Sequence, residues 1–116
     1  GWTLIDNNPR SVRITGDNGR LYQQHDNGLI WEFTGAPCAS STNCPGWRLI
    51  DNNPASVDIV AGGNELYQRH GNGMIWEFTG GACTGSGASL ACPGWRLLDN
   101  NPLTRQIAAT GGLLYQ

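Results

Sequence analysis

The sequence predicts an all-β fold, and three features of the chain carry this prediction. A nine-residue motif occurs three times within the 116 residues. Between its copies lie short runs of strand character, and clusters of Gly, Asn and Pro with turn-forming properties separate these runs. No segment has the apolar periodicity of an amphipathic helix. Short strands joined by tight turns are therefore expected throughout.

The repeated motif runs from Gly-Trp to Asp-Asn-Asn-Pro. It occupies 1–9, 46–54 and 94–102, so its copies begin 45 and 48 residues apart. Leu-Tyr-Gln and Ile-Trp-Glu-Phe-Thr-Gly recur at matching positions between the copies. The change in spacing falls between the cysteines of each unit, as expected of a surface connection that tolerates insertions.

Each full period is predicted to contain four strands. In the second period the first two, at 56–61 and 65–70, are joined by Gly62-Gly63-Asn64. His-Gly-Asn-Gly leads to the third strand, at 74–79, and Asn-Gly is the strongest short-range hairpin signal. The fourth strand, at 95–99, leads through Asp-Asn-Asn-Pro into the next period, since Pro presets φ and Asn tolerates left-handed backbone.

Four antiparallel strands in each such period are typical of a β-propeller blade. We therefore predict a single propeller-repeat domain over 1–116, with units at 1–45 and 46–93 and a partial unit at 94–116. Residues 2–6 are expected to form an outer strand without its blade, and 104–116 an inner pair of strands without its outer strands.

About two and a half blades would leave apolar faces and strand edges uncovered. We expect one of two arrangements. Either copies of the chain close a ring by self-association into a homo-oligomer, or the chain is a fragment of a longer propeller.

The composition argues against several classes of function. Only 14% of the residues are charged and the net charge is -2, so a nucleic acid is not an expected partner. No apolar run approaches the roughly 20 residues that a membrane-spanning helix needs, so membrane insertion is not expected. The sequence contains no nucleophile elbow, phosphate loop or metalloprotease motif, and we predict no enzyme activity and no cofactor.

Two acidic residues, Glu32 and Glu77, recur inside a predicted strand. Glycoside hydrolysis needs two carboxylates about 5 to 9.5 Å apart across one sugar. Equivalent positions in successive blades are too far apart for that chemistry. Pairing with a neighbouring arginine, such as Arg48 or Arg96, is the expected role.

The four cysteines form two local pairs, Cys38 with Cys44 and Cys83 with Cys92. An even number of closely paired cysteines predicts two disulfides and a secreted, extracellular protein. A zinc site is the alternative, but neither pair has the spacing of a zinc knuckle and no His lies near them.

The recurring Gly-Trp-x-Leu-Ile/Leu-Asp-Asn-Asn-Pro and Leu-Tyr-Gln-x-His-x-Asn-Gly-x-Ile-Trp-Glu-Phe-Thr-Gly resemble the repeats of lectin propellers of the tachylectin and tectonin type. The resemblance covers essentially the whole chain. It implies a secreted or surface propeller that binds sugars at one shallow site per blade or blade interface. The chain departs from that family in its size, so the family's fine sugar specificity does not carry over to it.

Polar loops predicted to share one rim supply groups that suit a sugar. Because strand direction alternates, the Asp-Asn-Asn-Pro and His-x-Asn-Gly connections emerge at one face, and the disulfide loops and 16–19 at the other. Sugar hydroxyls need amide or carboxylate partners, and an apolar sugar face stacks on an aromatic ring. The candidate carbohydrate-binding residues are Asp6, Asn7, Asn8, His25, Asn27, Trp31, Asp51, Asn52, Asn53, His70, Asn72, Trp76, Asp99, Asn100 and Asn101.

Structural roles compete with each of these assignments. The Asp-Asn-Asn-Pro side chains suit turn capping, and the histidines beside the hairpin turns suit structural hydrogen bonds. Packing between blades is expected for Trp2, Trp47 and Trp95, and a core position is an alternative for Trp31 and Trp76. Calcium at Asp17-Asn18-Gly19 or Asp26-Asn27-Gly28 is a weaker alternative, because too few acids cluster there.

The expected function is multivalent, non-covalent glycan recognition by a lectin. The alternative is a structural or protein-interaction scaffold without a glycan ligand, including an engineered or excised repeat module.

Overall fold

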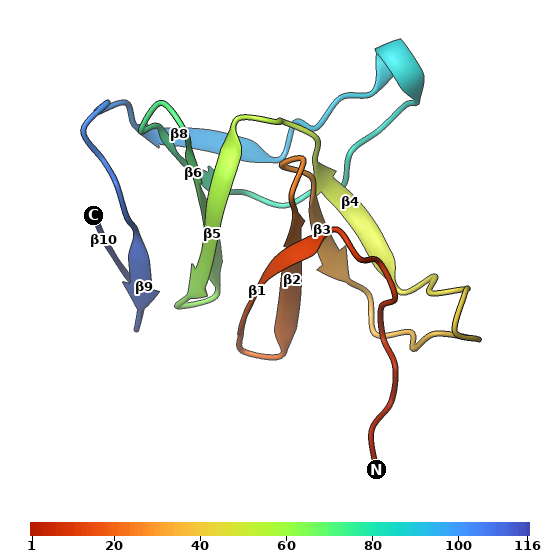
Figure 1. Cartoon of the computed structure of the whole chain (residues 1–116). Helices are drawn as coiled ribbons and strands as arrows, with labels where there is room; N and C mark the ends of the chain where they lie inside the picture. Colours follow the sequence, from red (N-terminus) through yellow and green to blue (C-terminus); the bar gives the residue numbers. More distant parts are fainter.

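The computed structural model describes all residues from 1 to 116 and is all-β, as predicted. Its ten strands form antiparallel sheets, and its helical content is a single 3-10 turn, Gly87–Ser89 (Figure 1). No helix has the length and apolar character needed to cross a membrane. The architecture is therefore set by strand pairing and by the contacts between sheets.

Two four-stranded sheets have the same up-and-down order, and a two-stranded hairpin follows them. The first sheet contains β1 (Ser11–Asp17), β2 (Arg20–His25), β3 (Ile30–Phe33) and β4 (Trp47–Asp51); the second contains β5 (Ser56–Gly62), β6 (Glu65–His70), β7 (Ile75–Phe78) and β8 (Trp95–Asp99); the hairpin contains β9 (Ala108–Thr110) and β10 (Leu113–Tyr115). The strands predicted at 56–61, 65–70, 74–79 and 95–99 are thus present, the third of them shorter at both ends. Registers match between the sheets: Trp31 pairs with Leu49, and Trp76 with Leu97.

Two kinds of turn join the strands. Asn18 and Gly19 both have positive φ, as do Gly63 and Asn64, which is the backbone of a tight type I′ hairpin. In the His-x-Asn-Gly turns, by contrast, only the glycine has positive φ. An added Cβ at Gly73 would lie 2.3 Å from the carbonyl oxygen of Asn101, and one at Gly28 would lie 2.4 Å from that of Asn53. Each of these turns therefore packs directly on the Asn-Pro connection that leaves its own sheet.

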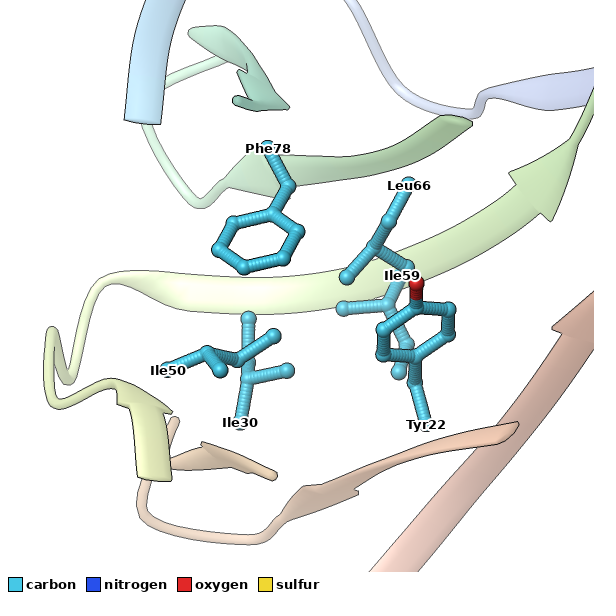
Figure 2. Packing of buried hydrophobic residues seen from close by; sticks show 6 residues of the cluster. All are labelled: Tyr22, Ile30, Ile50, Ile59, Leu66 and Phe78. Atoms are coloured by element: carbon cyan, nitrogen blue, oxygen red, sulfur yellow. The ribbon is translucent and has the colours of Figure 1, made fainter. Parts of the chain in front are cut away.

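The core lies between neighbouring sheets. Figure 2 shows the larger cluster, whose buried members are Tyr22, Ile30 and Ile50 from the first sheet and Ile59, Leu66 and Phe78 from the second. A smaller cluster joins Tyr67 and Ile75 to Ile107, which precedes β9. Burial of each such side chain contributes about 1.5–3 kcal/mol, so the sheets are held together chiefly by this face-to-face packing.

The first strands of the three sheets, β1, β5 and β9, follow one another across the molecule, and neighbours among them are in contact (Figure 1). The backbone N–H of Ala61 donates to Thr15 Oγ1 at 2.9 Å, and that of Asn64 donates to Asp17 Oδ2 at 2.8 Å. Arg13 and Asp58 form an ion pair across the same boundary, with an N–O distance of 3.4 Å. Polar contacts thus fix the relative position of the first two sheets along their inner edge.

The prediction of a strand at 2–6 is wrong. This segment forms no strand, and Trp2 is fully exposed rather than packed between sheets, because no neighbouring strand is present to pair with it. The segment nevertheless makes one backbone hydrogen bond that its counterpart β4 also makes. Cys38 N–H donates to the Leu4 carbonyl at 2.9 Å, as Cys83 N–H does to the carbonyl of Leu49 in β4.

The prediction for 104–116 is confirmed in shortened form, as the hairpin β9–β10. Both four-stranded sheets are open, and no closed ring forms within the chain. The sheets do not coincide with the sequence units at 1–45 and 46–93. Each four-stranded sheet takes its fourth strand from the beginning of the next sequence repeat.

Candidate functional site

Two cavities occupy corresponding positions in the repeat, and nine equivalent residues line both of them in the same order. The first site, of about 210 Å³, is lined by Asp6, Asn7, Asn8, Gln23, His25, Trp31, Cys44, Pro45 and Trp47. The second site, of about 510 Å³, is lined by Asp51, Asn52, Asn53, Pro54, Gln68, His70, Trp76, Cys92, Pro93 and Trp95. The structure thus brings together most of the candidates predicted in the first two units.

The second site lies between two sheets. Asp51 ends β4 of the first sheet, and the connection to the second sheet supplies Asn52 and Asn53. The opposite wall comes from the second sheet, where His70 ends β6 and Trp76 lies in β7. Their rings are 5.7 Å apart, and those of His25 and Trp31 in the first site are 5.8 Å apart. Each site therefore combines polar groups from one connection with an imidazole–indole pair from a sheet.

Burial shifts the pKa values of the ionisable groups in these sites. Desolvation raises the pKa of the Asp51 carboxyl, and the Gln68 side chain and the backbone N–H groups of Asn52 and Asn53 oppose the rise. Desolvation lowers the pKa of His25 and of His70. Both imidazoles are consequently uncharged at neutral pH and present one N–H donor and one acceptor nitrogen.

Several buried polar atoms in the sites have no hydrogen-bond partner. In the second site they are Asp51 Oδ2 and Trp76 Nε1, and in the first site they are His25 Nε2 and Trp31 Nε1. Buried polar groups are satisfied in the large majority of protein structures. Each site thus holds unmet hydrogen-bonding capacity, which lies on the imidazole–indole pair itself and, in the second site, also on Asp51.

The indole N–H groups of Trp47 and Trp95, which begin the second and third copies of the repeated motif, both have hydrogen-bond partners. Trp47 Nε1 donates to the Ile5 carbonyl, and Trp95 Nε1 donates to the Ile50 carbonyl, each at 2.8 Å. Their rings pack on Phe33 and Phe78 with centroids 5.1 Å apart. Phe33 and Phe78 lie in the same sheets as Trp47 and Trp95, so these ring contacts are made within a sheet. Trp95 also packs against the core between the two sheets, as predicted, whereas Trp47 bonds to the segment that precedes β1. Both tryptophans also line a site.

Turn capping accounts for part of the asparagine pattern. Oδ1 of Asn8, Asn53 and Asn101 accepts a hydrogen bond from the backbone N–H two residues later, at 2.9 to 3.0 Å. Asn27 and Asn72 cap their hairpin turns in the same way, at 3.3 and 3.1 Å. These last two residues line neither site, so the structure does not bring them together with the other candidates.

The third group of candidates is not assembled into a similar site. Asn101 lines a separate cavity of about 430 Å³ together with Thr104, Arg105 and Gln116, and no His or Trp joins them. Asp99 and Asn100 do not line this cavity. Asp99 Oδ2 is buried without a partner, as Asp51 Oδ2 is.

Sequence reasoning missed Gln23 and Gln68. Both belong to the repeated Leu-Tyr-Gln, and both precede the site histidine by two residues in a strand. Alternate residues of a strand face the same side, so this spacing was the available signal. Gln68 Oε1 lies 3.2 Å from His70 Nε2 and orients that ring.

Both predicted disulfides are present, with Sγ–Sγ distances of 2.02 Å for Cys38–Cys44 and 2.00 Å for Cys83–Cys92. No cysteine is free, which removes the zinc alternative. The loops themselves are not confined to the face opposite the sites, contrary to the prediction. Cys44–Pro45 and Cys92–Pro93 line the sites, because each loop folds back to hydrogen-bond with the neighbouring outer segment, as Cys83 does with Leu49.

The repeated glutamates pair with arginines, as predicted. Arg48 Nε donates to Glu32 Oε2 at 2.7 Å, and Arg96 Nε donates to Glu77 Oε2 at 3.1 Å. Asp17 and Asn18 contact Asn64 of the next sheet, and Asp26 pairs with Arg10 at 2.7 Å. No group of three His, Cys, Asp or Glu side chains is placed to hold a metal ion.

The two sites therefore offer hydrogen-bond donors, acceptors and an aromatic surface, arranged alike in successive repeats. The chain matches no protein-family model, no curated protein and no solved structure.

Proposed function

We propose that the protein is a non-catalytic, carbohydrate-binding lectin of the propeller type that its repeated motifs resemble. The observation that carries the proposal is the repeated site in which an imidazole–indole pair with unpaired ring nitrogens lies beside the polar Asp-Asn-Asn connection. A sugar presents hydroxyls that both donate and accept, together with apolar C–H faces that stack on aromatic rings. This is the combination of groups that the first and second sites offer.

Weak single sites become useful through repetition. An open cavity with one aromatic surface and a few hydrogen bonds supports an affinity near millimolar, about -4 kcal/mol. Several sites on one rigid body raise the avidity for a matching glycan array by about 10² to 10⁴. The two disulfides support a place in an oxidising compartment, which for a lectin is the cell exterior.

We further propose that the sheets are blades and that self-association covers an exposed apolar face. Ile14 in β1 is 73% exposed, whereas Ile59 and Ile107, at the same position of the repeat, are each 6% exposed. The first sheet thus presents to solvent the face that the second sheet buries. In a further copy Tyr22, Ile30 and Ile50 are already buried, so the surface it offers is the uncovered hairpin β9–β10, where Leu113 and Tyr115 are 59% and 53% exposed.

A glycan array followed by calorimetric titration tests the proposal. Binding to a defined sugar that is weakened in Asn52→Ala supports it, because Asn52 lines the second site. A folded protein that binds no glycan on the array would favour the second candidate function, a scaffold for protein partners. Exposed apolar side chains such as Trp2, Ile14 and Leu103 favour that candidate.

A further inference from the structure

The two sites differ in size although their lining residues are the same types. The second site, of about 510 Å³, falls within the range of about 300–1,000 Å³ that is usual for small-molecule pockets, and the first, of about 210 Å³, falls below it. The nine lining positions that the two sites share carry identical residues, so side-chain identity at these positions does not cause the difference in volume. Its origin must lie in how neighbouring segments cover each site.

Two segments differ between the sites: 2–6 forms no strand where its counterpart is β4, and the disulfide loops differ in length. The first disulfide loop closes over a sequence separation of 6 and the second over a separation of 9. The first loop makes a tight turn, with Ser40 and Asn43 in an isolated bridge. Asn7 Nδ2 donates to the carbonyl of Ser41 in this loop at 2.6 Å. A lining residue of the first site is thus tied to its own loop.

The second loop makes no equivalent contact. It narrows at a bridge between Thr84 and Ala91 and then extends into the exposed 3-10 turn Gly87–Ser89, which projects away from the sheets (Figure 1). Asn52, the counterpart of Asn7, forms no hydrogen bond with it and is exposed. Its amide therefore retains two donors and an acceptor at the mouth of the larger site.

We infer that the length of the disulfide loop sets the size of the glycan that each site accepts. The second site takes two or more linked sugars, with Asn52 binding the second one, whereas the first site takes a single terminal sugar. This inference rests on the proposed carbohydrate-binding function. It assigns different ligands to two sites whose sequence motifs are nearly identical.

A site-resolved NMR titration tests the inference. The indole N–H signals of Trp31 and Trp76 report the first and second sites, and Trp31→Phe and Trp76→Phe assign them. The probes are the monosaccharide that the array identifies and a disaccharide that ends in it. We expect the disaccharide to bind the second site about five- to tenfold more tightly than the monosaccharide, and the first site to discriminate by less than about twofold.

Exchanging the loops supplies the causal test. A chimera in which 84–91 is replaced by the sequence of 39–43 should lose the disaccharide preference of the second site, and the reciprocal chimera should gain one at the first. Asn52→Ala needs no loop to refold, and it should reduce the disaccharide affinity of the second site about fivefold.

The outcomes separate the inference from the proposed function. Equal discrimination at both sites, or a preference that survives both the loop exchange and Asn52→Ala, would overturn the inference and leave the lectin proposal standing. Failure of every arrayed sugar to shift either indole signal would overturn both.

Discussion

The indole Nε1–H of Trp95 donates a hydrogen bond to the backbone carbonyl of Ile50, 2.8 Å away. Trp95 begins β8 of the second sheet, and Ile50 lies in β4 of the first. Since Ile50 is fully buried, this carbonyl has no access to water as an alternative partner. The bond therefore joins the sheets at the edge of their shared apolar core.

Trp95→Phe should lower the free energy of unfolding by about 1–3 kcal/mol, because it leaves the Ile50 carbonyl buried without a donor. Urea denaturation followed by far-ultraviolet circular dichroism measures the change. Trp47→Phe is the matched control and should cost less, since its acceptor, Ile5, lies in a segment without strand structure. Equal losses in the two variants, or a loss below about 0.5 kcal/mol for Trp95→Phe, would contradict this account.

Asn52 and Asn53 are adjacent but have separable roles. Asn53→Ala removes the cap on the N–H of Ala55 and should cost about 1 kcal/mol of stability. Asn52→Ala should leave stability within about 0.5 kcal/mol of the parent chain while weakening glycan binding. Thermal denaturation of both variants measures the effect on stability, and calorimetric titration measures the effect on glycan binding. A stability loss confined to Asn52→Ala would show that the wrong side chain has been assigned to the turn.

Stability should rise as the pH rises from about 5 to 6.5. Burial lowers the pKa of His25 and His70, so in this window the unfolded chain binds protons that the folded chain does not. Denaturant midpoints measured across the window test the slope. The double variant His25→Gln, His70→Gln should flatten it, and an unchanged slope in that variant would assign the effect to other groups.

The carboxyl of Asp51 acts with the opposite sign and at lower pH. Burial raises the pKa of this carboxyl, so at a pH just above about 4 the folded chain still holds a proton that the unfolded chain has lost. The contribution of Asp51 to the free energy of unfolding therefore falls as the pH rises through this range. Asp51→Asn should abolish that fall and leave the histidine-dependent rise intact. The same denaturant series measures both effects.

Self-association depends on the exposed face of the first sheet. The parent chain should have a mass above that of a monomer by light scattering at micromolar concentration, and Ile14→Glu should shift it toward the monomer. Val12→Glu is the matched control, because Val12 is 58% exposed and its counterpart Val57 remains 40% exposed in the second sheet. A monomeric parent chain would end the self-association proposal.

The repeat made most of the strands predictable. Each strand of the second sheet is bounded by Gly, Asn or Pro, and the same boundaries occur in the first sheet, so local turn chemistry located them within a few residues. The segment at 2–6 shows the limit of such reasoning. Its sequence matches that of β4, but a strand needs a hydrogen-bonded neighbour, and none is provided there.

The candidate site was predictable where its residues lie next to turns, as His70 and Asn52 do. The part of the disulfide loops in lining the sites was not predictable. It depends on hydrogen bonds between segments far apart in the sequence, such as that from the N–H of Cys83 to the carbonyl of Leu49. Gln68 was accessible in principle through its two-residue spacing from His70. The difference in volume between the sites was not predictable, because nine of the lining positions carry the same residues in both.

The close approach of Gly28 to Asn53, and of Gly73 to Asn101, has a consequence for the curvature of the whole array. These glycines lie in the β2–β3 and β6–β7 turns and let each turn pack against the connection that leaves its sheet. A methyl group at either position would push that connection outward. The lack of a side chain at Gly28 thus helps to set the angle between the two four-stranded sheets.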